Sequence, residues 1–115
     1  MDLPGNAAGI LTRAMKPGMD RALRSLEALL EGDEVTDGLL VRAHGENLVL
    51  AREEKNADGA KIIDDRVRLT RLSKTTWGLS VRRHTGRWER TPFTGSLKEM
   101  VETIQTLMQH LIAAY

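Results

Sequence analysis

The sequence contains no cysteine, and aromatic residues make up only 3% of it. The absence of cysteine excludes disulfides, thiolate nucleophiles and Cys-ligated zinc or iron–sulfur centres. Because aromatic residues are scarce, the core has to be built mainly from Leu, Val, Ile, Ala and Met. No apolar run approaches the roughly 18 residues that are needed to span a bilayer. We therefore expect no membrane-spanning segment and no membrane partner.

The chain also lacks the motifs of common catalytic and nucleotide-binding sites. It has no G-x-S-x-G nucleophile elbow, no phosphate-binding loop and no G-x-G-x-x-G. The three histidines, His44, His84 and His110, form no H-x-x-x-H or H-E-x-x-H pair, so we interpret each as an ordinary surface histidine. Residues 54–65 resemble an EF-hand calcium loop, but a polar hairpin turn explains them without an ion. We therefore predict a protein that is not an enzyme and has no metal or cofactor.

The length and composition predict one soluble domain. The chain has 115 residues, of which 41% are hydrophobic and 29% charged, as in an ordinary globular protein. Residues 1–5 show neither the basic region nor the apolar region of a signal peptide. We expect a single domain over residues 1–115 and a cytoplasmic location.

Charge is strongly segregated along the chain, although the net charge is only +1. Residues 27–65 carry eleven acidic and four basic side chains, whereas residues 66–115 carry nine basic and three acidic ones. Such a distribution can create a basic field on one face of the molecule. The alternative is a solvated strand surface whose arginines pair with the acidic half of the same chain.

The period of the apolar residues changes along the chain and predicts an α+β fold. Residues 1–32 form a helical N-terminal segment, with a helix from Pro17 that Gly32 ends. Residues 39–93 form an antiparallel meander of four or five strands, and Pro92 ends the last strand because proline cannot continue a ladder. A long amphipathic helix over residues 96–113 packs on the sheet.

The C-terminal helix carries the clearest helical pattern. Ser96 and Glu99 form a capping box at its start. Eight large apolar residues share one face: Leu97, Met100, Val101, Ile104, Leu107, Met108, Leu111 and Ile112. Because this stripe exceeds what one thin sheet needs, we expect the surplus to pair two copies into a homodimer.

The strands of the basic segment alternate apolar and basic side chains, which predicts a sheet with one apolar and one basic face. Single-stranded nucleic acids are held by cations that follow the phosphates and by aromatic rings on which bases stack. Seven residues are candidates for such contacts: Arg66, Arg68, Arg71, Lys74, Arg82, Trp88 and Arg90. Changing Arg66 and Arg68 together to Glu is expected to abolish binding and to leave the fold intact.

The position of Trp88 depends on the register of one hairpin. If His84, Thr85 and Gly86 form a three-residue loop, Trp88 lies opposite Arg82 on the polar face. If Thr85 and Gly86 form a two-residue turn, Trp88 joins the core instead. The sequence leaves both registers open, and we favour the core register because a tryptophan in a strand is more often buried.

In element order, residues 39–115 resemble the single-stranded-DNA-binding fold of the transcriptional coactivator and Whirly proteins. The resemblance rests on the element order, an antiparallel sheet followed by a helix, and on the basic strands between Arg66 and Arg90. It implies a dimer that binds melted DNA, and a role connected with transcription. The DNA-facing residues that it implies are Arg66, Arg68, Lys74, Arg82 and Trp88. The helix over residues 17–31 and the fifth strand depart from the family's pattern.

We therefore expect a small non-enzymatic protein that binds single-stranded DNA or RNA electrostatically on a basic sheet face. The alternative is a protein-interaction module, in which the acidic segment meets the basic segment of another copy or of a partner.

Overall fold

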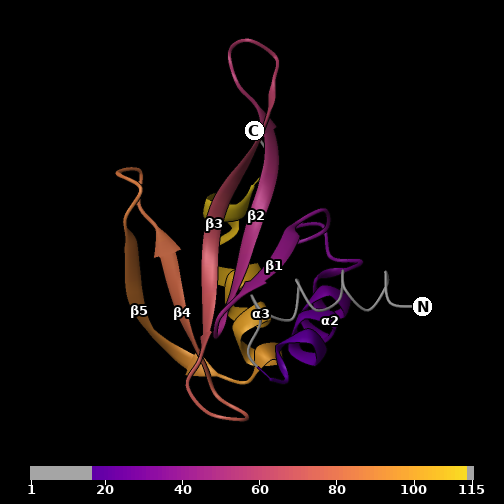
Figure 1. Ribbon diagram of the computed structural model, residues 1–115, viewed down its shortest axis with the longest axis vertical. Coiled ribbons are helices and arrows are strands. Elements are labelled where there is room, and N and C mark those ends of the chain that lie inside the picture. Colours follow the sequence, from indigo (N-terminus) through magenta and orange to yellow (C-terminus); the bar gives the residue numbers. More distant parts are fainter. Residues whose placement is uncertain (1–16, 114–115) are drawn as a thin grey trace, which may run out of the picture.

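The structure, a computed structural model, describes residues 17–113 (Figure 1). The part of the expected helical N-terminal segment before residue 17 lies outside the described residues. The elements are α2 (Met19–Leu30), β1 (Leu40–His44), β2 (Asn47–Lys55), β3 (Lys61–Arg71), β4 (Trp77–Arg82), β5 (Trp88–Gly95), α3 (Leu97–Leu107) and α4 (Gln109–Ile112). This order confirms the predicted α+β class.

The five strands form one antiparallel meander in the order β1-β2-β3-β4-β5, as expected. In Figure 1 α3 and α4 lie behind the strands, on one face of the sheet, and α2 lies beside β1 and contacts both β1 and α3. No helix among residues 17–113 lies on the other face, which we call the open face. Because α2 contacts both β1 and α3, it shares the helix face and leaves the open face uncovered.

The core fills the space between the sheet and the helices. Strand register places Leu48, Leu69 and Leu79 side by side on the helix face of three neighbouring strands. Their side chains are almost completely buried, together with Leu26 of α2 and Ile104 of α3. Alternation along each strand sends the intervening residues to the open face, so the expected division into an apolar and a polar face follows from period 2.

The expected long C-terminal helix is instead a shorter one, because α3 ends at Leu107 and only the single turn α4 follows Met108. The hydroxyls of Thr103 and Thr106 donate to the carbonyls of Glu99 and Glu102 one turn back, and such bonds bend helices. The capping box is confirmed, since the Ser96 and Glu99 side chains each accept from the other residue's backbone N–H.

The sheet and α2 use most of the apolar stripe of this helix. Five of its residues are buried: Met100, Val101, Ile104, Met108 and Ile112. Leu107, by contrast, is 58% exposed. The surplus that we expected to drive pairing is therefore reduced to little more than one side chain, and the homodimer stays a prediction.

Two arginines of the central strands hold the end of α4. Arg52 of β2 donates from Nε to the Ile112 carbonyl at 2.7 Å, and its other nitrogens donate to Val35 and Asp37 carbonyls. Arg66 of β3 donates to the carbonyls of the two residues flanking Ile112. Cations are favourable at a helix C-terminus, where the last carbonyls lack partners.

Pro92 does not end the last strand, because β5 continues through it to Gly95. The expectation failed because β5 is the outermost strand and pairs with β4 alone. A proline has no backbone N–H to donate. In a central strand every N–H faces a neighbouring strand, whereas in an edge strand the missing donor can face solvent.

The β2–β3 hairpin extends well beyond the neighbouring strands and forms the arm at the top of Figure 1. At its tip the Asn56 side chain accepts hydrogen bonds from the backbone N–H groups of Asp58 and Ala60. Ile62 and Ile63 on this arm are 44% and 54% exposed. The residues that resemble a calcium loop thus form a self-sufficient hairpin turn.

Candidate nucleic-acid interface

The β4–β5 hairpin adopts the register with a three-residue loop. Arg83 donates from its backbone N to the Arg87 carbonyl at 2.8 Å, and Arg82 lies opposite Trp88. Gly86, the last loop residue, has φ 87°, the left-handed conformation that such loops require. Trp88 therefore lies on the open face, and the core register that we favoured is wrong.

Trp88 brings together arginines from two other strands. The Cζ atoms of Arg68 and Arg82 lie 4.7 and 5.4 Å from its ring centre. Arg68 lies opposite Ser80, and Ser80 lies opposite Arg90, so one cross-strand row adds a third arginine to the group. We call Arg68, Arg82, Trp88 and Arg90 the open-face cluster. Cation–π contacts contribute about 0.5–2 kcal/mol each and orient the guanidinium planes.

Arg68 carries a charge that the described residues do not neutralise. Its Nε is buried and, within residues 17–113, has no hydrogen-bond partner. Burial lowers the pKa of Arg68, and the nearby charge of Arg90 lowers it further. A buried donor without a partner costs about 1–3 kcal/mol, so an anion that accepts from this nitrogen would recover that cost.

A carboxylate that sequence reasoning missed lies at one end of the cluster. Asp65 accepts two hydrogen bonds from Arg42 of β1, at 2.6 and 2.8 Å, and one from Arg82 at 3.3 Å. The hydrogen bonds from Arg42 hold the pKa of Asp65 below its usual range, and the charges of both arginines add to this effect. Asp65 thus offsets part of the positive charge of the open face.

Arg66 does not lie on the open face. It is 5% exposed and forms ion pairs with Asp64 at 2.7 Å and with Glu54 at 3.1 Å on the helix face. This placement corrects the expectation that Arg66 and Arg68 share a face. The Arg66→Glu change is consequently expected to disturb the fold, contrary to our expectation from the sequence.

A β-bulge explains the placement of Arg66. The register of β2 and β3 runs from Leu50 opposite Val67 to Ala51 opposite Asp65, so Arg66 has no opposite residue. An extra residue in one strand breaks the alternation of faces at that point. Strict period 2 therefore predicts the wrong face for Arg66 and for the residues of β3 that precede it, and the same shift brings Asp65 to the open face.

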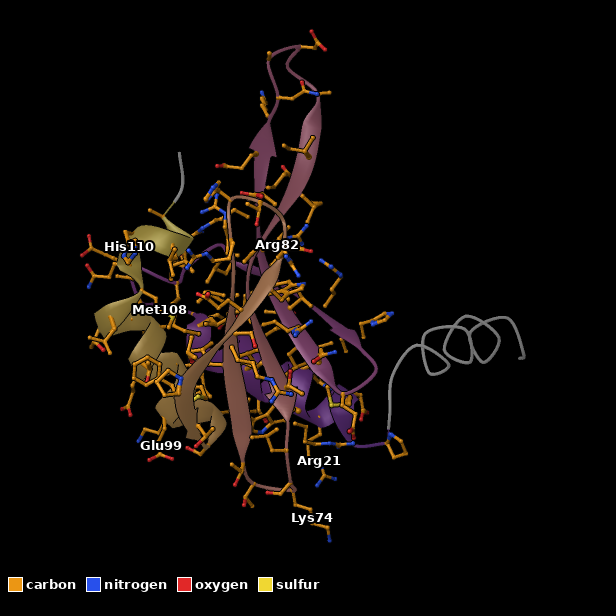
Figure 2. The ribbon with its side chains drawn as sticks, turned by 90° about the vertical axis from the view of Figure 1, so that its left-hand side faces the viewer. Arg21, Lys74, Arg82, Glu99, Met108 and His110 are labelled. Carbon is orange, nitrogen blue, oxygen red and sulfur yellow. The ribbon has the colours of Figure 1, made fainter. Side chains whose placement is uncertain are left out.

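Arg71 and Lys74 also lie away from the cluster. Arg71 donates to the Pro17 carbonyl and to the Glu46 carboxylate, beside the start of α2. Lys74 is exposed in the turn between β3 and β4, and Figure 2 shows it at the end of the sheet opposite to Arg82. Of the seven candidate residues, the structure brings together the four of the open-face cluster.

Two histidines line a cavity near the end of α4, away from the open-face cluster. This cavity, of about 470 Å³, is lined by His84 and His110 together with Asp64 and Asp65. Both aspartates are already engaged, Asp64 with Arg66 and Asp65 with Arg42. Across residues 17–113 there is no group of three or more histidine, aspartate or glutamate side chains placed to hold a metal ion. Sequence spacing could not reveal this cavity, because its residues meet only through the fold.

No protein-family model, no curated protein and no solved structure significantly matches this chain. The resemblance in element order to coactivator and Whirly proteins therefore stays a prediction. None of the helices in the described part of the chain has the length and apolar character needed to cross a membrane. Function has to be argued from the chemistry of the site, because a fold by itself does not specify one.

Proposed function

We propose that this protein binds single-stranded nucleic acid, DNA or RNA, on the open face of its sheet. The observation that carries the proposal is the open-face cluster, in which three arginines surround Trp88 on a face that no described helix covers. Cations that follow phosphates and flat groups that stack with bases are the two components of single-strand binding.

The cluster can offer both kinds of contact at once. Bases stack on aromatic rings and also on guanidinium planes. Because Arg68 and Arg82 lie over the half-buried Trp88 ring, the arginines extend a stacking surface outward from the sheet. Arg90 is exposed beside them, within reach of the sugar–phosphate backbone. Such contacts read flat faces and charge, so we expect little sequence preference and no chemical reaction.

The test is fluorescence anisotropy of a labelled oligo-dT of about 20 nucleotides at several salt concentrations. Single-strand affinity falls with a log–log salt slope of about −0.7 per phosphate contact, so removing two arginines should make the slope less steep by about 1.4. The test variant is Arg68→Met with Arg90→Met. The control is Arg21→Met with Lys98→Met, which removes the same charge from exposed positions on α2 and α3.

We expect wild type and the control to bind alike and the open-face variant to bind at least tenfold more weakly. An equal loss in both variants would show that only net charge matters. Absence of binding by the wild type at low salt would reject the proposal. Poly-rU in place of oligo-dT shows whether the site discriminates RNA from DNA.

A protein-interaction role is the second candidate, and the β2–β3 arm favours it. Ile62 and Ile63 are exposed there, and the outer half of each arm strand pairs with the other alone. Several arginines of the basic segment already pair with acidic residues of the same chain, which leaves fewer charges for a partner. If Ile62→Thr with Ile63→Thr dissociates an oligomer seen by light scattering, the arm is an interface. If the wild-type protein is a monomer at every concentration, the arm is not an interface between copies of this chain.

A further inference from the structure

A small hollow on the open face adjoins the open-face cluster. It has a volume of about 250 Å³ and lies between β3, β4 and β5. It exists because Gly78 and Ser80 on β4 carry little or no side chain, whereas Arg68 and Leu72 on one side and Arg90 on the other are long. A Cβ at Gly78 would lie 3.3 Å from Leu72 Cδ1, so a larger residue at this position would fill part of the hollow.

Two arginines, one amide and four hydroxyls line the hollow, and none of the described residues that line it is acidic. Arg68 contributes the buried Nε, which finds no hydrogen-bond partner in residues 17–113, and Arg90 adds a second positive charge. Ser80 is only 4% exposed, and no hydrogen bond of its hydroxyl is found among the described residues. The Thr70 hydroxyl donates to Asn47 Oδ1 at 2.6 Å, so the amide N–H groups of Asn47 stay available as donors.

We propose that this hollow binds a phosphate monoester, and that it takes the terminal phosphate of a nucleic-acid strand bound by the cluster. The second half of the proposal rests on the proposed function and deepens it. A phosphate monoester carries about 1.5 to 2 negative charges at pH 7 and three strong acceptor oxygens. Its charge therefore matches two guanidinium groups, and its oxygens match the donors that the hollow leaves unpaired.

Charge and size favour a terminal phosphate over an internal one. An internal phosphodiester carries one negative charge and has to leave room for the strand on both sides. The hollow is smaller than the cavities of about 300–1,000 Å³ that enclose drug-sized ligands, so it fits a compact group. The larger cavity beside His84 is less suitable. Asp64 and Asp65 line it, and its three arginines, Arg66, Arg82 and Arg83, already form ion pairs with carboxylates of the same chain.

The first experiment tests the hollow without nucleic acid. The full-length chain, labelled with ¹⁵N, is titrated with inorganic phosphate at pH 7.5, and with sodium chloride at matched ionic strength. We expect phosphate, and not chloride, to shift the backbone amides of Thr70 and Ser80. The Ser80→Ala variant, which keeps the charge, should weaken this response at least threefold, and Arg68→Met should remove it. Equal shifts with chloride, or an undiminished response in Arg68→Met, would overturn the proposed site.

The second experiment tests the strand end. Oligo-dT of the same length, with a 5′-phosphate, with a 3′-phosphate or with neither, is compared by anisotropy at fixed salt. We expect at least one terminal phosphate to strengthen binding about tenfold, equivalent to about 1.4 kcal/mol. Ser80→Ala should reduce that preference and leave the affinity for the unphosphorylated strand unchanged.

The two experiments separate the possible failures. If all three oligonucleotides bind equally and with salt dependence, the proposed function stands and the terminal-phosphate assignment fails. If none binds but inorganic phosphate still shifts Thr70 and Ser80, the hollow is a phosphate site and the nucleic-acid function fails. If neither response occurs, both proposals are wrong.

Discussion

The guanidinium of Arg68 lies over the ring of Trp88, with its Cζ atom 4.7 Å from the ring centre, while its buried Nε has no hydrogen-bond partner among the described residues. The contact joins β3 to β5 across the intervening strand β4. Burial and the nearby charge of Arg90 both disfavour the charged guanidinium of Arg68, and the cation–π contact opposes that cost. The open face thus holds in place a positive group for which the described part of the chain supplies no counter-ion.

Replacing Arg68 by Met is expected to keep or raise the stability of the fold. The change removes a buried donor that costs about 1–3 kcal/mol and forfeits a cation–π contact of about 0.5–2 kcal/mol. The difference between these two ranges runs from a fall of about 1 kcal/mol to a rise of about 2.5 kcal/mol, so we expect the free energy of unfolding in urea to stay near its wild-type value or to rise. A fall of more than 1 kcal/mol would show that Arg68 contributes to folding more than the structure indicates.

Replacing Arg66 by Met is expected to have the opposite effect. The change leaves Asp64 and Glu54 without their shared cation and removes hydrogen bonds to two carbonyls near the end of α4. Breaking a buried ion pair on one side costs about 3–5 kcal/mol, and the exposure of Asp64 places the expected loss at the lower end. Urea unfolding measures the loss, and hydrogen exchange should show faster opening of the α4 amides. A neutral result would mean that Arg66 is not structural.

Replacing Asp65 by Asn is expected to strengthen binding of oligo-dT. Asp65 is the carboxylate that pairs with Arg42 and Arg82 on the open face, and its removal frees their charges for phosphates. We expect about a three- to tenfold gain in affinity at low salt, since each added phosphate contact steepens the salt dependence. The matched control is Asp58→Asn at the exposed tip of the β2–β3 arm. If both variants gain equally, the effect comes from net charge and not from the open face.

The contribution of Asp65 to stability should depend on pH in a defined direction. Its pKa in the folded protein lies below the ordinary value of 3.8, mainly because Arg42 donates hydrogen bonds to it. A group whose folded pKa is depressed stabilises the fold fully above its unfolded pKa, and that stability is lost as pH falls through the folded value. Wild type should thus be more stable than Asp65→Asn at pH 6, with the difference shrinking below pH 3.8. A difference that is independent of pH would contradict this assignment.

The elements and their order could be predicted from the sequence, because they depend on local periodicity and capping. The alternation of Val67 and Leu69 with polar neighbours placed the sheet core, and Ser96 with Glu99 marked the helix start. Arg42 could also have been found, since it alternates with Val41 and Ala43 in the first strand. It lies outside the basic segment, so charge density along the sequence does not single it out.

The register at Trp88 was predictable from the turn chemistry. A two-residue type I′ turn would need a positive φ at Thr85, and a β-branched residue rarely adopts one. That local argument outweighs the general tendency of tryptophan to be buried. The bulge at Arg66 is different, because it arises between two strands that are distant in sequence. The sequence around Arg66 does not indicate that β3 has one residue more than β2 at this point of their pairing.

The position of Pro92 limits how copies of this chain could pair through the edges of their sheets. A growing filament needs two edges per molecule, one to accept a neighbour and one to offer the next attachment point. Pro92 interrupts the row of N–H donors on β5, and edge prolines of this kind hinder addition of a further strand. We therefore expect strand addition only at the β1 edge, where two copies could pair but a third could not join, so that edge-to-edge association would stop at a dimer.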